Sequence, residues 1–419
     1  MLKMKDSGIE WIGEIPETWE VASNKFVMTK IKQIISKYTG EPILSLSMSG
    51  VHERKLDGGG KMPATFDGYQ AVKRGNLLLC LFDIDVTPRC VGYIQTDGIT
   101  SPAYSQYEVN DNNSVKYYYY YYLMIDNNKV LVHLTKSLRN TINTAQFDNI
   151  KAIVPPKLEQ QQIANFLDRK TTEIDELIDK INIEIDTLKQ YQSSVITQAV
   201  TKGLDPNVQM KDSGIEWIGE IPETWEIAPL YKYFSERKNK NHTGNEKNLL
   251  SLSYGRIVRK NIESKGGLLP ESFTTYNIIE PGDIIIRPTD LQNDTRSLRT
   301  GLSNEHGIIT SAYIDLAPES KTNSRYYHYL LHSYDIQKVF YNMGNGVRQG
   351  LNYSEFSKLR VPIPEQTEQR QIADYLDQKV AKIQKIIKSK QQQINQLTEY
   401  KNSLIFEYVT GKKQVKEAN

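Results

Sequence analysis

The chain has 419 residues, of which 24% are charged and 39% hydrophobic, a composition ordinary for a folded protein of about two or three domains. Two cysteines, Cys80 and Cys90, exclude a disulfide framework, and the absence of long apolar runs excludes a membrane span or signal peptide, so we expect a cytoplasmic protein without a membrane partner. The formal net charge of +2 is too small to indicate binding to nucleic acid, so such binding can be argued only from local basic patches.

A segment near the N-terminus occurs twice. Residues 4–20, MKDSGIEWIGEIPETWE, return unchanged as residues 210–226. The correspondence continues in weaker form: residues 44–47 match 250–253, residues 101–104 resemble 310–313, and residues 159–164 match 368–373. A period of about two hundred residues is too long for a solenoid or propeller and indicates a duplicated domain.

The first globular part, residues 1–156, mixes short apolar runs with Gly, Pro, Asn and Asp, which is typical of strands joined by loops. Candidate strands lie at residues 43–46, 77–82 and 90–94. Residues 117–124 begin with six consecutive tyrosines. Asn113 and Ser114 before them are potential caps and favour a helix, with a strand as the alternative. We therefore expect a mixed α and β globule.

A heptad pattern follows and predicts a first long helix over residues 157–203. Its main packing positions are Leu167, Ile174, Ile178, Ile181, Ile185 and Leu188. The second copy repeats this order with a globular part over residues 204–364, a helix over 365–411 and a tail over 412–419. Packing positions of the second helix are Leu376, Val380, Ile383, Ile387, Ile394, Leu397 and Leu404, and Lys390 interrupts one row.

Each helix has so narrow an apolar stripe that it would not be stable alone in water, so we expect the two helices to pack on each other. Two equivalent globules that lead into equivalent helices can be related by a pseudo-two-fold axis only if the helices run antiparallel. The predicted fold class is α+β: two mixed α/β globular domains joined by two long antiparallel coiled-coil helices in a pseudo-two-fold dumbbell. Two heads on a rod suit the two-fold symmetry of DNA, although a scaffold protein explains the helices equally well.

Local charge favours the DNA hypothesis. Residues 231–265 carry nine basic residues against three acids, which suits contact with phosphates. Residues 287–299 supply arginine, glutamine and asparagine side chains, which pair with guanine and adenine edges. The predicted DNA-binding residues are Arg54, Lys55, Lys61, Arg89, Arg139, Arg256, Arg259, Lys260, Arg287, Gln292, Asn293, Arg296, Arg299 and Arg348. For any single one of them, a solvated charged loop is the alternative.

The two copies diverge at residues 50–67 against 254–273 and at 82–96 against 287–305. Two domains that read different half-sites should differ where they read, so we expect these loops to touch bases. Arg139 and Arg348, equivalent positions near the end of each globule, are expected to contact the DNA backbone. The tryptophans lie only in the identical segment, so we interpret that segment as a structural brace rather than a base-stacking surface.

Motifs for catalysis are weak. Residues 58–61, GGGK, are followed by Met62 where a phosphate loop needs Ser or Thr. His328 and His332 could share a helix face but lack a third metal ligand. The two cysteines are ten residues apart, lack a CxxC arrangement and are expected to be buried. We predict no catalytic residue and no metal site.

These motifs together resemble the DNA-specificity subunit of type I restriction-modification systems. The resemblance rests on GIEWIGEIPETWE, on the SPAY-like segment, on Glu-Gln-x-x-Ile-Ala-x-x-Leu-Asp at residues 159–168 and 368–377, and on the two-fold layout. It covers nearly the whole chain. The resemblance implies that each globule is a target recognition domain that reads one half of a bipartite sequence in double-stranded DNA.

The resemblance also implies partners. The long helices would set the spacing between the half-sites and dock two methyltransferase subunits, and motor-nuclease subunits would join that core. S-adenosylmethionine, ATP and Mg²⁺ would act in those partners, and this chain would be a non-catalytic subunit. Two other classes stay open from the residues alone: a stand-alone DNA-binding regulator, and a coiled-coil scaffold with no salt-dependent binding to duplex DNA.

Overall fold

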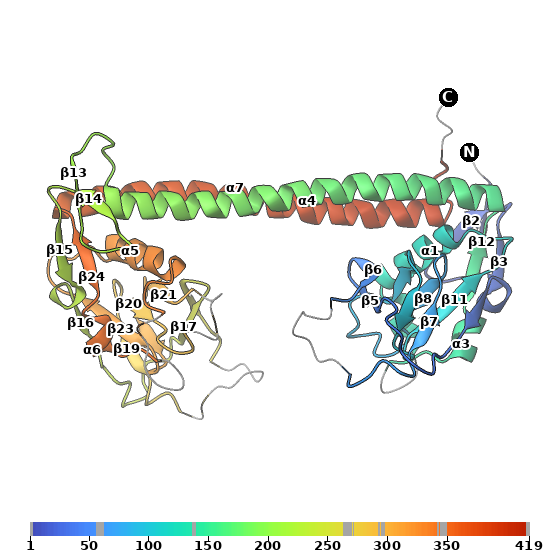
Figure 1. Ribbon diagram of the computed structural model, residues 1–419, viewed down its shortest axis with the longest axis horizontal. Coiled ribbons are helices and arrows are strands. Elements are labelled where there is room, and N and C mark those ends of the chain that lie inside the picture. Colours follow the sequence, from blue (N-terminus) through green and yellow to red (C-terminus); the bar gives the residue numbers. More distant parts are fainter. Residues whose placement is uncertain are drawn as a thin grey trace. The chain divides into compact units, whose positions relative to one another are not determined.

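The computed structural model describes residues 3–55, 63–135, 140–262, 270, 272–291, 294, 298–341, 343 and 350–415. The chain divides into two compact units, which we call unit 1 (Met1–Ile181 with Gln391–Asn419) and unit 2 (Asn182–Lys390). Each unit contains one globular part and portions of both long helices (Figure 1). Among the described residues, no helix is both long enough and apolar enough to span a bilayer.

Unit 1 is built on a four-stranded antiparallel sheet in the order β4 (Met28–Ile31), β11 (Ser105–Val109), β8 (Leu77–Leu79) and β9 (Val91–Tyr93). Antiparallel pairs surround it: β1 (Met4–Asp6) with β2 (Glu14–Pro16), β3 (Glu20–Ser23) with β12 (Lys151–Val154), β5 (Leu44–Ser47) with β6 (Gly50–Glu53), and β7 (Gln70–Val72) with β10 (Gly98–Thr100). Its short helices are η1 (Asn24–Phe26), α1 (Val115–Asn127), α2 (Val130–Leu134) and α3 (Thr144–Asn149).

Unit 2 repeats this pairing scheme. Its four-stranded sheet has the order β16 (Phe234–Glu236), β23 (Ile314–Pro318), β20 (Ile284–Ile286) and β21 (Thr300–Leu302). The pairs are β13 (Met210–Asp212) with β14 (Glu220–Pro222), β15 (Glu226–Pro229) with β24 (Arg360–Ile363), β17 (Leu250–Ser253) with β18 (Arg256–Arg259), and β19 (Asn277–Ile279) with β22 (Gly307–Ile309). Its short helices are η2 (Leu230–Lys232), α5 (Ser324–Ile336) and α6 (Tyr353–Phe356). The mixed helix and strand content confirms the α+β class.

The tyrosine run forms helix α1, so the helical alternative is confirmed. The Ser114 side chain accepts a hydrogen bond from the Tyr117 backbone N–H and caps the helix. Buried tyrosine hydroxyls of this helix donate hydrogen bonds to neighbouring elements. Tyr118 donates to the Ile153 carbonyl at 3.1 Å, and Tyr120 donates to Asp168 at 2.7 Å. Helix α1 is thereby fastened to the sheet and to the first long helix.

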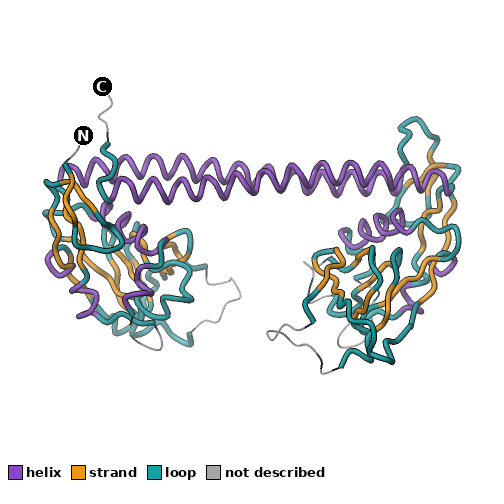
Figure 2. The backbone as a smooth tube through the Cα atoms, turned by 180° about the vertical axis from the view of Figure 1, so that it is seen from behind, coloured by secondary structure: helices purple, strands orange, loops and turns teal. Residues whose placement is uncertain are grey.

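The two long helices are α4 (Lys157–Lys202) and α7 (Gln366–Val409), which begin and end within two residues of the predicted limits. They run antiparallel within each unit (Figure 2). In unit 1 the ring of Phe166 packs on Tyr408 at 4.3 Å, and Lys401 forms an ion pair with Asp175. In unit 2 Lys390, the residue that interrupts an apolar row, forms an ion pair with Glu184. The break in the heptad pattern is therefore compensated by a charge partner.

The predicted packing positions of both helices face inward. Fully buried are Leu167, Ile174, Ile181, Ile185, Leu376, Ile383 and Leu404, and half-buried are Ile178, Leu188, Val380, Ile387, Ile394 and Leu397. Burial of seven such side chains supplies on the order of 10 kcal/mol of transfer free energy.

The duplicated N-terminal segment braces the start of each long helix, as predicted. The indole N–H of Trp19 donates to Glu159 Oε2 at 2.9 Å, and that of Trp225 donates to Glu368 Oε2 at 2.9 Å. Both indoles are buried. The neighbouring Gln160 side chain donates to the Pro155 carbonyl at 2.8 Å. The motif at each helix start therefore consists of residues that fasten the helix to its globular part.

Candidate nucleic-acid interface

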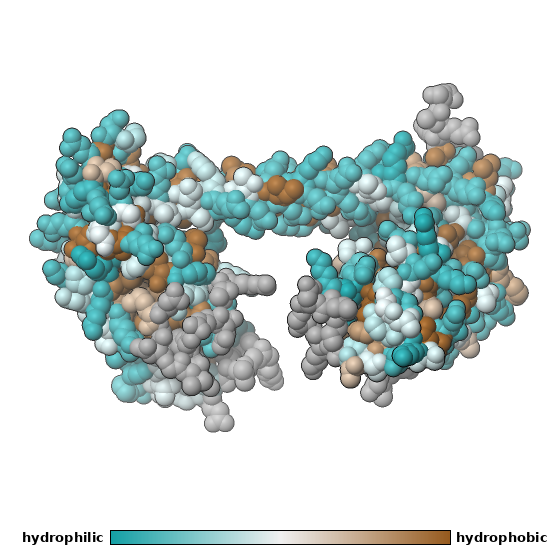
Figure 3. Space-filling view, in the orientation of Figure 1, coloured by the Kyte–Doolittle hydropathy of each residue, from teal (hydrophilic) through white to brown (hydrophobic). Residues whose placement is uncertain are grey.

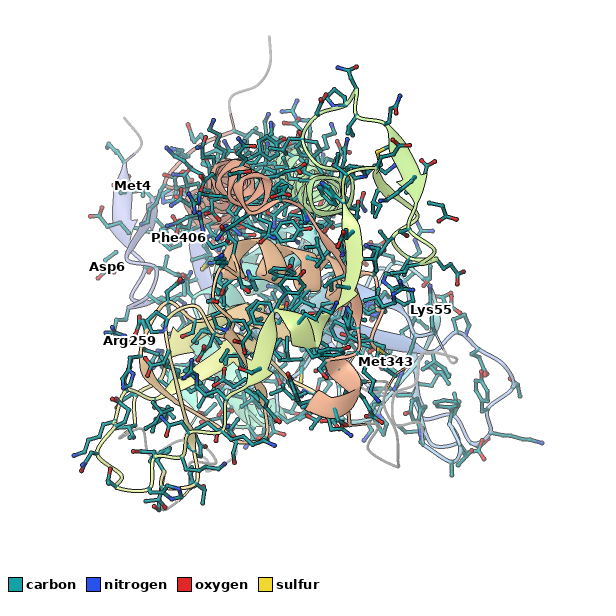
Figure 4. The ribbon with its side chains drawn as sticks, turned by 90° about the vertical axis from the view of Figure 1, so that its left-hand side faces the viewer. Met4, Asp6, Lys55, Arg259, Met343 and Phe406 are labelled. Carbon is teal, nitrogen blue, oxygen red and sulfur yellow. The ribbon has the colours of Figure 1, made fainter. Side chains whose placement is uncertain are left out.

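The basic residues that sequence reasoning assigned to DNA converge on the β17–β18 hairpin of unit 2. Arg256 and Arg259 lie on β18 and Lys260 follows it, and all three side chains are exposed. Arg259 lies at the outer surface of unit 2 (Figure 4), with 71% of its side chain exposed and an ion pair to Glu305. The Arg256 guanidinium donates to Gln384 Oε1 on α7 at 2.7 Å. This hairpin therefore presents three cations that an anionic backbone can reach.

Unit 1 presents a less basic hairpin at the equivalent place. Strands β5 and β6 pair in the same way, and Arg54 and Lys55 follow β6. Lys55 is exposed and Arg54 is half-buried. At the position of Arg259 unit 1 carries Glu53, which is also exposed. The two hairpins therefore share a backbone and differ in charge.

Two glycines that sequence reasoning missed lock both hairpins onto their sheets. A Cβ at Gly301 would lie 2.5 Å from Leu252 Cδ1, and a Cβ at Gly92 would lie 2.5 Å from Val51 Cγ2. A side chain at either position would displace the Leu252 or Val51 methyl group, because real Cβ contacts essentially never reach this distance. The signal that could have found them is a glycine in the middle of the same strand in both copies.

Arg299 was predicted to contact bases, and this prediction is wrong. Its side chain is fully buried. The guanidinium donates to the Asp290 carbonyl at 2.8 Å, to the Asp294 carbonyl at 2.6 Å and to the Thr289 carbonyl. Its charge also lies over the Tyr341 ring, 5.0 Å from the centroid. The guanidinium, with its five N–H donors, binds the backbone of the segment before β21 from the inside, and in this position it cannot reach a DNA groove.

Arg89, the counterpart prediction in unit 1, is corrected in the same sense. Only 14% of its side chain is exposed. The guanidinium donates to Asn127 Oδ1 at 2.8 Å and lies 3.4 Å from Asp126 Oδ2. Arg89 therefore fastens its loop to the end of α1 because both partners lie there, and we assign it a structural role.

Arg287 remains half-exposed, 31% of its side chain, and pairs with Asp294 at 3.3 Å and Asp290 at 3.8 Å. Its DNA role stays a prediction. The remaining predicted contacts lie outside the described residues: Lys61, Arg139, Gln292, Asn293, Arg296 and Arg348.

A buried aspartate anchors the divergent loop in each unit. Asp126 on α1 accepts the backbone N–H of Cys90 at 2.8 Å, and Asp335 on α5 accepts that of Arg299 at 2.5 Å. Cys80 and Cys90 are buried as predicted, and burial raises the pKa of each thiol, which keeps both protonated. The divergent loop of each unit is therefore held by an aspartate at the same place. The buried side chain that follows is a thiol in unit 1 and a guanidinium in unit 2.

The sheet of unit 2 contains a buried acid pair that unit 1 lacks. Asp315 and Asp283 are both buried, and the Arg237 guanidinium donates to Asp283 at 2.8 and 3.1 Å while lying 3.9 Å from Asp315. Burial and the charge of Asp283 raise the pKa of Asp315 to about 8. The equivalent strand position in unit 1 is the neutral Gln106. Asp315 is therefore protonated at neutral pH, which leaves Asp283 to balance Arg237.

We expect Asp315→Asn to remove a pH dependence from the stability of unit 2. The folded state holds a proton between pH ~4 and pH ~8 that the unfolded chain does not, so the wild-type free energy of unfolding falls as pH rises through that window. The variant should be more stable than the wild type by about 5 kcal/mol at pH 8 and nearly equal to it at pH 4. Urea unfolding from pH 4 to 9 measures this. The exposed Asp186→Asn is the control, and parallel profiles for D315N and wild type would contradict the assignment.

A cavity of about 480 Å³ in unit 2 lies between the β17–β18 hairpin and the helices, lined in part by His328 and His332. Burial lowers the pKa of His328 to about 3 and that of His332 to about 4, so both imidazoles are neutral. Across the described ranges, no group of three or more His, Cys, Asp or Glu side chains is placed to hold a metal ion. The features that the described residues offer for binding are therefore the exposed surfaces of the β5–β6 and β17–β18 hairpins.

Comparisons with known proteins agree with this geometry. Residues 91–187 and 302–396 match the family described as "Type I restriction modification DNA specificity domain". The chain is 26% identical over 284 residues to the "Putative type I restriction enzyme MjaX specificity subunit" of Methanocaldococcus jannaschii, a match covering 66% of this chain and 63% of that protein. It is 25% identical over 288 residues to the "Type I restriction enzyme MjaVIII specificity subunit" of the same organism, covering 65% of this chain and 64% of that protein.

The fold also has a solved counterpart. A chain from the structure described as "Structural basis underlying complex assembly and conformational transition of the type I R-M system" superposes with a TM-score of 0.68 at 12% identity, covering 95% of this chain and 99% of that one. The two family matches fall at equivalent places in the duplicated halves. Each half of the chain therefore carries a segment that matches the type I restriction modification DNA specificity domain.

Proposed function

We propose that this chain is the DNA specificity subunit of a type I restriction-modification complex, in which each unit reads one half of a bipartite sequence in double-stranded DNA. One observation carries the proposal: the two units share a buried frame almost position for position and differ on an exposed hairpin at the same place. A shared frame with divergent exposed surface is what two readers of different half-sites need. The family match and the specificity-subunit relatives support the same function.

In this proposal the long helices set the spacing between half-sites and dock two methyltransferase subunits, which motor-nuclease subunits then join. Their surface is mostly hydrophilic (Figure 3), as expected for helices that are exposed until a partner binds. Large apolar side chains nevertheless stand out on them: Leu177, Ile183, Tyr191, Ile386 and Tyr400 are 45–66% exposed. Such residues are suited to bury against a partner. We expect S-adenosylmethionine, ATP and Mg²⁺ to be bound by the partner subunits.

Mapping of methylated adenines tests the function. The full chain is co-expressed with its partner methyltransferase in a host that lacks it, and methylated positions are read from genomic DNA. We expect one bipartite motif with a fixed spacer that disappears when this chain is omitted. A stand-alone regulator would bind DNA without the methyltransferase and leave no such motif, and a scaffold would show no binding to duplex DNA at any salt concentration.

The hairpin cations give a quantitative test of the interface. Arg259→Ala with Lys260→Ala should weaken binding of the assembled complex to target DNA about tenfold or more and flatten the logarithmic dependence of affinity on salt concentration by about two units, because two phosphate contacts are lost. Lys189→Ala on α4, exposed and paired with Asp186, is the control. An unchanged salt dependence in the double variant would place the phosphates elsewhere.

A further inference from the structure

The tips of the two hairpins expose large apolar side chains at equivalent positions. Met48 follows β5 and is 62% exposed, and Tyr254 follows β17 and is 87% exposed. Both come directly after the same sequence, Leu-Ser-Leu-Ser, at residues 44–47 and 250–253. A single exposed apolar residue needs no explanation. Unlike apolar side chains that are both exposed at the same place in two copies do need one.

The backbone at the second tip is not the one that a tyrosine prefers. Tyr254 has φ +47° and Gly255 has φ +75°, and the two residues form the turn that pairs Ser253 with Arg256. Turns with two left-handed residues favour Asn-Gly or Asp-Gly. A bulky side chain there is strained, and its exposure means that packing within the chain does not repay the strain. The first tip avoids this strain because Gly50 takes the positive φ, +99°.

The base of each hairpin is closely packed in the same way in both units. Besides Gly92 and Gly301 on the edge strands β9 and β21, Gly98 and Gly307 admit a close backbone approach: a Cβ at either would lie 2.5 Å from the carbonyl oxygen of Pro42 or of Asn248. Leu44 and Leu250, at the start of the hairpins, are buried in equivalent small apolar clusters. The bases of the two hairpins are therefore packed alike, while the residues at their tips differ.

Cations lie on the same hairpin as the apolar tip. In unit 2 Arg256 directly follows the turn and is held by Gln384, Arg259 ends β18 and Lys260 follows it. In unit 1 Arg54 and Lys55 follow the strand that leaves the turn. An exposed apolar tip on a hairpin that also carries cations matches duplex DNA, in which base edges and thymine methyl groups lie between two rows of phosphates.

We propose that the two hairpin tips are the base-reading elements of the two domains, with Met48 and Tyr254 in direct contact with bases of different half-sites and the adjacent cations on the flanking phosphates. The proposal rests on the proposed function and narrows it to two residues. Apolar side chains at such tips contact thymine methyl groups or wedge against a base step. The strain at Tyr254 is then explained by DNA contact.

Tyr254→Asn tests the proposal without a risk of misfolding, because Asn-Gly is the preferred sequence for this turn and the thermal stability of the chain should stay equal or rise. In the complex with its methyltransferase, we expect methylation of the target to slow about tenfold or more and the base preference to relax in one half-site only. Met48→Ala should relax the other half-site. Tyr231→Asn, an exposed tyrosine of the same unit away from the hairpin, is the matched control.

Three outcomes overturn the proposal. An unchanged methylation motif in both Y254N and M48A shows that the tips read nothing. Weaker co-purification with the methyltransferase, while the remaining methylation stays at the wild-type motif, shows that the tips contact a protein subunit instead. Relaxation of both half-sites by one variant shows that the tips act through the complex as a whole. Failure of the proposed function itself is distinguishable, because the wild-type complex would then leave no bipartite motif to alter.

Discussion

Arg299→Ala is expected to lower the free energy of unfolding of unit 2 by about 3–5 kcal/mol. The guanidinium is fully buried and holds three backbone carbonyls, those of Thr289, Asp290 and Asp294. Alanine leaves these acceptors without donors and opens a cavity beside Tyr341. Urea unfolding followed by circular dichroism measures the loss, and hydrogen exchange assigns it to unit 2.

Two further variants separate folding from binding. Arg259→Ala, on the exposed hairpin, should change stability by less than about 1 kcal/mol because its ion pair is solvent-screened. Arg299→Lys should still be clearly destabilised, because an ammonium cannot bridge three carbonyls as the guanidinium does. If R299A kept wild-type stability and lost only DNA binding, the structural role assigned to Arg299 would be wrong and a base contact would be the better interpretation.

Trp225→Ala is expected to have the next largest effect, a loss of about 3–5 kcal/mol from unit 2. The indole is completely buried and donates to Glu368 at the first turn of α7. It also packs against Gly203, just after α4 ends, where a Cβ would lie 3.4 Å from Trp225 Cζ2. One side chain thus fastens the end of α4 and the start of α7 to the duplicated segment.

Graded substitutions at this site resolve the two contributions. Trp225→Phe keeps much of the buried ring and loses the hydrogen bond, so we expect a loss of about 1–2 kcal/mol. Trp217→Ala, in the same segment but 40% exposed, is the control and should cost clearly less than Trp225→Ala. Thermal unfolding of the three variants gives the order. Equal losses for W225A and W217A would show that the brace does not depend on the buried indole.

The helices could be predicted because their signals are local. The heptad rows of α4 and α7 need only the period of the sequence, and the limits of both helices follow from prolines before them and a glycine after them. The tyrosine run was ambiguous only until its cap was considered, because Ser114 supplies the acceptor that a helix N-terminus requires. The bracing role of Trp19 and Trp225 was predicted because their segments are identical in the two copies, whereas surfaces that read different DNA sequences should differ.

The arginines could not be sorted in the same way. Arg256, Arg259, Arg287 and Arg299 are alike in sequence, and charge alone suggests exposure for all of them. Arg299 is buried because Asp335, thirty-six residues later on α5, holds its backbone while carbonyls of the preceding segment surround its side chain. The role of Gly92 and Gly301 was equally hard to predict, because a glycine in a strand does not show which side chain packs against it.

The amino-acid sequence by itself determined the duplication, the division of each copy into a globule and a long helix, and the family that the copies resemble, because repeats, periods and caps are properties of neighbours along the chain. Only the tertiary structure decided which cations remain available to DNA. Burial is set by residues that meet across the sheet and helices, and through these contacts Arg299 became a scaffold while the hairpin of Arg259 and Tyr254 remained on the surface.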